Sequence, residues 1–113
     1  MPSKSATGAL LDIQRQIELA RSFVEGMTFE HFRDDRRTVY AVIRCLEIIS
    51  EASRRLPGEL KDRQPHVPWA NMAGAGNVYR HDYEDVADEM VWQTVQDSLG
   101  PLLAVVRDEL QRP

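Results

Sequence analysis

Side chains suited to chemistry are concentrated in one stretch of this chain, residues 74–86. Asn77, Arg80, His81 and Tyr83 lie there beside a second tyrosine and three carboxylates. Among the three histidines of the chain, only His81 has a cation and two phenols as close sequence neighbours. Because histidine titrates near neutral pH, His81 is the first candidate for a general acid or base. The same residues are also typical of a helix C-terminus, where His and Arg face the last carbonyls.

The elements before this stretch are predicted to be amphipathic helices. Residues 9–25 place apolar side chains on one helical face, and Gly26 supplies a stop. Thr28 is typical of an N-cap for a short helical turn, and Asp34-Asp35 offers another cap. Residues 37–56 carry the longest apolar stripe without Gly or Pro, at Val39, Val42, Ile43, Leu46, Ile49 and Leu56.

Three charged residues lie along this long helix. Arg44, Glu47 and Glu51 are spaced at i, i+3 and i+7. This spacing predicts an ion-pair ladder along the edge of the core. A functional role for Arg44 remains an alternative, because a cation on a largely apolar helix needs a partner.

The remaining chain is punctuated by proline and glycine. Pro57-Gly58 ends the long helix, and residues 59–67 are expected to form a polar connection, with Lys61, Arg63 and His66 at the surface. Pro68-Trp69 opens a further helix that loses regularity near His81.

The C-terminal third predicts a last helical region. Residues 85–88 offer caps, residues 91–99 and 102–110 carry apolar stripes, and Gly100-Pro101 between them predicts a kink or restart. Few stretches alternate as strands do. The sequence therefore predicts an all-α fold, an antiparallel bundle of four to five helices.

Length and composition indicate one globular domain over residues 1–113, with residues 1–8 expected to be flexible. The only cysteine, Cys45, lies in an apolar run and is interpreted as a core thiol of a protein in a reducing compartment. No apolar segment has the length of a membrane span and no signal peptide is evident, so a cytoplasmic location without membrane contact is predicted. The net charge of −4 disfavours a protein that coats nucleic acid, but eight of the fourteen Lys and Arg lie between Arg33 and Arg63.

Several site classes have no support in the sequence. His31, His66 and His81 are scattered, without paired His or Cys at metal-ligand spacing, so no metal is expected. Gly74 and Gly76 do not form a phosphate loop, since no strand precedes them and no Lys-Ser/Thr pair follows. No cofactor is expected.

The pattern across nearly the whole chain resembles the HepT-like family, the minimal branch of the HEPN superfamily of nucleotide-binding and ribonuclease domains. The matching segments lie in the same order along the chain, and they are residues 11–13, 42–52, 67–69, 77–86 and 91–92. The resemblance implies a HEPN-like helical bundle and a homodimer whose two motif regions face each other across a cleft.

The family motif is an arginine, commonly followed by asparagine, then three residues, histidine, any residue and tyrosine. Asn77, His81 and Tyr83 fall on this motif, whereas Gly76 occupies the position of the motif arginine. Arg80 lies four residues after Gly76, so on a helix it shares that face one turn later, and we hypothesise that it partly replaces the arginine. An ideal helix separates Arg80 and His81 by about 100°, so joint action needs a helix end or a second subunit.

The resemblance also implies a function. Family members resemble toxins of two-gene toxin–antitoxin pairs, which cleave RNA without metal and whose partner is a small nucleotidyltransferase that adds AMP at the position of Tyr83. A competing hypothesis is a catalytically degenerate dimer that acts as a partner- or nucleotide-binding module, with Gly76 recording the loss of chemistry. A third hypothesis is a nucleotide-binding helical domain without RNA cleavage.

Overall fold

The computed structural model describes the backbone of residues 4–72 and 84–112, and the side chains of residues 6–72 and 88–112. The chain is all-α, as predicted, and no strand occurs in these ranges. Within them, no helix is both long enough and apolar enough to cross a membrane.

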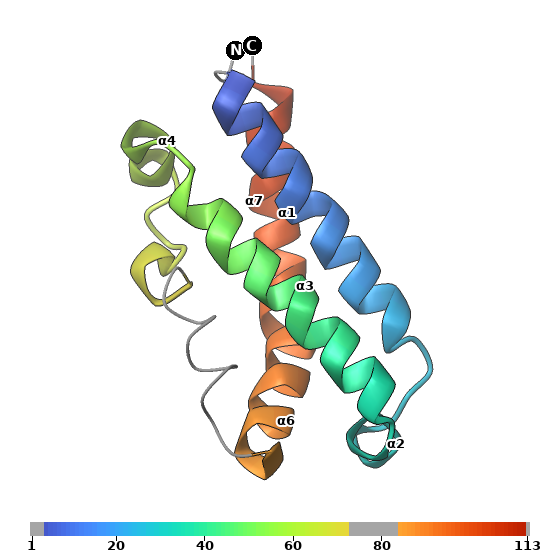
Figure 1. The fold of residues 1–113 in the computed structure, drawn as a ribbon. Helices are drawn as coiled ribbons and strands as arrows, with labels where there is room; N and C mark the ends of the chain where they lie inside the picture. The colour runs from blue at the N-terminus through green and yellow to red at the C-terminus, as the bar shows by residue number, and fades with distance from the viewer. Residues whose placement is uncertain (1–3, 73–83, 113) are drawn as a thin grey trace.

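Three long helical segments form the body of the molecule (Figure 1). They are α1 (Lys4–Phe23), α3 (Arg36–Arg54), and the continuous run of α6 (Glu84–Gln93), η1 (Thr94–Ser98) and α7 (Leu99–Gln111). α1 runs opposite to both of the others, and its N-terminus lies beside the C-terminus of α7. α3 and the α6–α7 run share one direction.

The first helix begins five residues earlier than its apolar stripe predicted. Ala6 extends the stripe of Leu10, Ile13 and Ile17 by one turn and is buried with them. Residues 4–8 are therefore helical, although their polar composition favoured a flexible end. At the other end, Gly26 adopts a φ of 79°, a left-handed conformation that glycine tolerates without steric cost, as the predicted stop requires.

Two side-chain caps fix the entry into α3. The Thr28 hydroxyl accepts a hydrogen bond from the His31 amide at 3.1 Å and begins α2 (Phe29–Asp34). Asp35 Oδ1 accepts from the Thr38 amide at 3.2 Å, and the Thr38 hydroxyl donates to Asp35 Oδ2 at 2.8 Å. These bonds hold the pKa of Asp35 below its ordinary value. Both predicted caps are confirmed.

The prediction of a purely polar connection over residues 59–67 was wrong. Gly58–Arg63 forms a helix, α4, whose Leu60 is buried in the core. Gln64 is also buried, and its amide nitrogen is satisfied there because it donates to Asp108 at 3.0 Å and to Glu109 at 2.9 Å. One apolar residue in a polar segment gives no periodic pattern, so the sequence did not indicate this helix.

The core is a single cluster in which all three long segments take part, and it includes the thiol of Cys45. Burial raises the pKa of this thiol, as expected for a packing residue rather than a nucleophile.

The kink or restart predicted at Gly100-Pro101 takes another form, a wider helical turn. The Leu99 amide bonds to the Thr94 carbonyl five residues back, so η1 is a π-helical turn immediately before Pro101. This wider turn accommodates the proline, and the helix continues through it.

Candidate active site

The predicted motif residues, Asn77, Arg80, His81 and Tyr83, and Gly76 at the motif-arginine position, lie outside the described residues. Their roles therefore stay predictions. The structure describes the segments on both sides of the motif and what holds each of them.

The segment before the motif is fixed by a tryptophan. The Trp69 ring nitrogen donates to the Gln64 carbonyl at 3.0 Å, which ties the start of this segment to the end of α4. The Met72 amide donates to the Pro68 carbonyl at 3.0 Å, so Pro68 opens a helical turn over residues 69–72, as predicted. The motif thus begins just after an anchored helical turn.

The segment after the motif is fixed by a buried ion pair. α6 begins at Glu84, directly after Tyr83, and Asp88 lies one turn inside it. Asp88 is 1% exposed, and its Oδ2 accepts from Arg36 Nη1 at 2.6 Å. The same Nη1 donates to the Arg33 carbonyl at 3.1 Å. Arg36 therefore joins the end of α2, the start of α3 and the start of α6.

This arrangement corrects the interpretation of residues 85–88 as caps, since the helix already begins at Glu84. Asp88 is an interior residue with its side chain turned to the core. Its second oxygen, Oδ1, has no hydrogen-bond partner among the described residues. A buried carboxylate with an open acceptor is costly, so the bond to Arg36 is all the more needed.

Aromatic packing holds the next turn of α6. The Trp92 ring lies 5.2 Å from the Phe32 ring and 6.1 Å from the Phe29 ring, measured between centroids. Tilted pairs at such distances are favourable beyond the area that they bury. Trp92 therefore packs α6 against α2.

A pocket of about 410 Å³ opens beside the segment before the motif. Its walls come from α3, residues 66–72 and the η1–α7 turn, and they are mostly apolar. His66, Asn71 and Asp97 are polar residues that also line it. Apolar walls with a carboxylate favour a neutral or cationic group over a phosphate.

A second buried carboxylate lies at the opposite end of the bundle. Glu109 on α7 is 1% exposed and accepts from Arg63 Nη2 at 2.7 Å, from Gln64 and from Arg112 Nε at 3.2 Å. Burial raises the pKa of Glu109, but these hydrogen bonds and the arginine charges outweigh it and leave the pKa below its ordinary value. Arg63 is exposed, as predicted, and it is also the structural partner of Glu109.

The predicted ladder on α3 forms only in part. Arg44 Nη1 lies 4.0 Å from Glu47 Oε1, and the Arg44 side chain is 67% exposed. Arg44 thus projects into solvent instead of lying on apolar surface. Within the described residues, no group of three His, Cys, Asp or Glu could hold a metal ion.

Sequence reasoning missed three residues where α3 meets α6: Arg36, Asp88 and Tyr40, which lies against Arg36. Arg36 and Asp88 are 52 positions apart, so no local spacing links them. Asp88 falls at an apolar position of the stripe that continues through Val91, Val95 and Leu99. This position on an apolar stripe was the one feature of the sequence that could have indicated a buried Asp88.

Comparison with known proteins identifies the family. The family described as "Ribonuclease HepT-like" matches residues 13–109. The chain belongs to the HepT-like family. A protein of Thermococcus cleftensis named "Probable ribonuclease HepT" is 40% identical over 93 residues, which cover 82% of this chain and 84% of that protein.

Two further relatives of this HepT-like chain have names that begin with "Putative RNase". One, from Methanocaldococcus jannaschii, is 32% identical over 96 residues, 85% of this chain and 79% of the relative. The other, from Caldanaerobacter subterraneus subsp. tengcongensis, is 33% identical over 100 residues, 88% of this chain and 89% of the relative. No match was found among solved structures.

Proposed function

We propose that this HepT-like chain is a metal-independent endoribonuclease, the toxin of a toxin–antitoxin pair, with His81 at its catalytic centre. The observation that carries the proposal is the family match over residues 13–109, which spans a motif with Asn77, His81 and Tyr83 in place. The relatives whose names state a ribonuclease support the same activity.

The proposed reaction is attack of an RNA 2′-oxygen on the adjacent phosphorus, with cleavage of the bond from phosphorus to the 5′-oxygen. His81 takes the 2′-hydroxyl proton, and a proton returns to the leaving 5′-oxygen. Arg80 stabilises the charge that develops on the non-bridging oxygens, and Asn77 orients the phosphate. The products are a 2′,3′-cyclic phosphate and a 5′-hydroxyl.

The segments around the motif support this proposal, because catalytic groups must be held in place by rigid neighbours. Trp69 anchors the segment before the motif, and the Arg36–Asp88 pair anchors the helix after it. The described segments on both sides of the motif are therefore held by specific side-chain contacts, which supports the proposal.

By the same family resemblance, we propose a homodimer in the cytoplasm that is silenced by a nucleotidyltransferase partner. The partner would transfer AMP from ATP to the Tyr83 hydroxyl, with pyrophosphate as the leaving group. The added nucleotide brings bulk and negative charge to a site that must accept RNA phosphate. A small nucleotidyltransferase gene beside this one would agree with the proposal.

The test is cleavage of RNA by the purified protein in EDTA, with Arg80→Ala compared with Arg107→Ala. Arg107 is an exposed arginine on α7, so its removal controls for the loss of one charge. We expect Arg80→Ala to lose roughly 100- to 1,000-fold in rate and Arg107→Ala to keep the parent rate. Equal rates for the two variants would refute the role of Arg80.

Gly76 favours a second candidate, a degenerate dimer that binds a partner or a nucleotide without cleaving RNA. Its signature is a parent protein that does not cleave RNA although mass spectrometry shows Tyr83 to be unmodified. Growth arrest on expression that disappears with His81→Ala would favour the enzyme over this module.

A further inference from the structure

Tyr40 on α3 is 59% exposed, the most exposed of the large hydrophobic side chains that the structure describes. A single exposed aromatic residue is ordinary on a protein surface. Tyr40 differs because its ring is held in place from the protein side.

A chain of contacts fixes the Tyr40 ring. Arg36 Cζ lies 5.4 Å from the ring centroid, within the range of a cation–π contact. Arg36 is itself held by Asp88 Oδ2 at 2.6 Å and by the Arg33 carbonyl at 3.1 Å. Because Asp88 is buried, the guanidinium cannot swing away without leaving a buried carboxylate unpaired. The ring thus packs against a guanidinium that is itself held in place.

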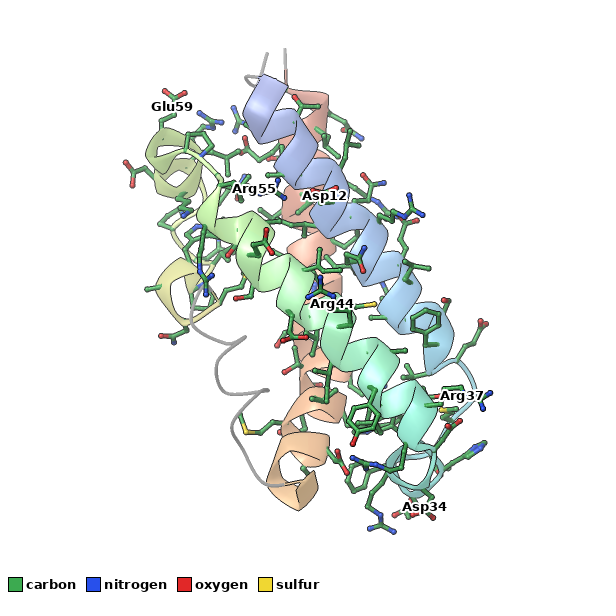
Figure 2. The ribbon with its side chains drawn as sticks, viewed as in Figure 1. Asp12, Asp34, Arg37, Arg44, Arg55 and Glu59 are labelled. Carbon is green, nitrogen blue, oxygen red and sulfur yellow. The ribbon has the colours of Figure 1, made fainter. Side chains whose placement is uncertain are left out.

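Exposed arginines lie on the same face. Arg37, Tyr40 and Arg44 are spaced at i, i+3 and i+7, which places all three along one side of α3. In Figure 2, Arg37 lies near the start of α3 and Arg44 near its middle. Arg44 meets Glu47 only at 4.0 Å. Because the Arg44 side chain is 67% exposed and solvent-exposed ion pairs are weak, a phosphate can compete with Glu47 for this guanidinium.

The Tyr40 ring is also linked to the helix that follows the motif in the sequence. Asp88 lies one turn into α6, which begins at Glu84. The residue that holds Arg36 against Tyr40 therefore also anchors the start of α6 to α3.

We propose that Tyr40 is a stacking platform for an unpaired base of single-stranded RNA, and that Arg37 and Arg44 contact the neighbouring phosphates. The inference rests on the proposed ribonuclease function for its choice of RNA. Single-stranded nucleic acid is bound by cations that follow the backbone and by aromatic rings on which bases stack. The face of α3 offers both.

The experiment measures binding separately from cleavage. A short RNA with 2′-O-methyl groups throughout cannot undergo 2′-oxygen attack, and its affinity is measured by fluorescence anisotropy in EDTA. We expect Tyr40→Leu, which keeps an apolar side chain but removes the ring, to weaken binding roughly 5- to 100-fold. Tyr40→Phe keeps the ring and should bind like the parent protein. Leu11→Ala alters another exposed apolar residue, on α1, and should have no effect.

Two further arms test the ligand and the arginines. An abasic oligonucleotide of the same length should bind the parent and Tyr40→Leu equally, because no base is left to stack. Arg37→Gln and Arg44→Gln should each reduce the slope of log affinity against log salt by roughly 0.7, whereas Arg107→Gln should leave the slope unchanged.

The outcomes separate this inference from the proposed function. Tight binding that depends on Tyr40, together with no cleavage of ordinary RNA, would refute the ribonuclease and support the platform. Unchanged affinity in Tyr40→Leu would overturn the platform. A second result would also overturn the platform. If Tyr40→Leu kept its RNA affinity but became monomeric by sedimentation, Tyr40 would be a contact between copies of the chain.

Discussion

Two carboxylates, Asp88 and Glu109, are buried to the same degree at opposite ends of the bundle. Each accepts a hydrogen bond from an arginine more than forty positions away in sequence, Arg36 or Arg63. A single sequence does not indicate which arginine pairs with such an acid, because the partner is brought close only by the fold. The predicted Asp35 cap is the opposite case, since its partner Thr38 is three residues away.

The buried Glu109 on α7 predicts how the stability of the protein depends on pH. The pKa of Glu109 is lowered in the fold, so its contribution to stability is present above its unfolded pKa and is lost as pH falls through the folded pKa. We expect Glu109→Gln to lower the free energy of unfolding at pH 7 by about 2–3 kcal/mol. The difference from the parent should shrink as the pH falls below the ordinary pKa of glutamate, about 4.3, as measured by urea denaturation.

The control is Asp12→Asn on α1. Asp12 and Arg55 point toward one another across α1 and α3 at 2.7 Å, but both side chains are about half exposed (Figure 2). This substitution should cost under about 1 kcal/mol. If Glu109→Gln and the parent protein instead lost stability in parallel as pH falls, the buried carboxylate would not be the group that titrates.

At the scale of elements, the caps and stripes that predict helices are local, and the structure confirms them for α1, α2 and α3. α4 was missed because its only buried apolar residue, Leu60, makes no pattern by itself. The π-helical form of η1 was missed because Gly100-Pro101 indicates a disturbance but not the number of residues that absorb it.

The junction of α2 and α3 gives an element-scale prediction. Asp35→Ala removes the side chain that caps α3 and should lower the free energy of unfolding, because the Thr38 amide loses its side-chain acceptor. Asp34→Ala, at the exposed neighbouring position, should change it by less than about 0.5 kcal/mol. Urea denaturation at pH 7 compares the two variants, and equal losses would show that the cap does not stabilise the helix.

At the scale of the whole molecule, the all-α fold and the HepT-like family could both be predicted from the sequence, because stripes and family segments run along nearly the whole chain. The candidate site was predicted only as a set of residues. Arg36, Asp88 and Tyr40 were not predicted, since they are brought together by packing between α3 and α6. Within the described residues, the molecule is therefore a helical frame whose contacts hold the segments on both sides of the proposed motif.

The measurement that tests the central claim most directly is the chemistry of the RNA ends produced in EDTA. His81→Ala is compared with His31→Ala, which changes an exposed histidine on α2, outside the motif. We predict 2′,3′-cyclic phosphate and 5′-hydroxyl ends from the parent and from His31→Ala, and a rate at least roughly 100-fold lower from His81→Ala. Products with a 3′-hydroxyl, or equal rates from both variants, would contradict catalysis by His81.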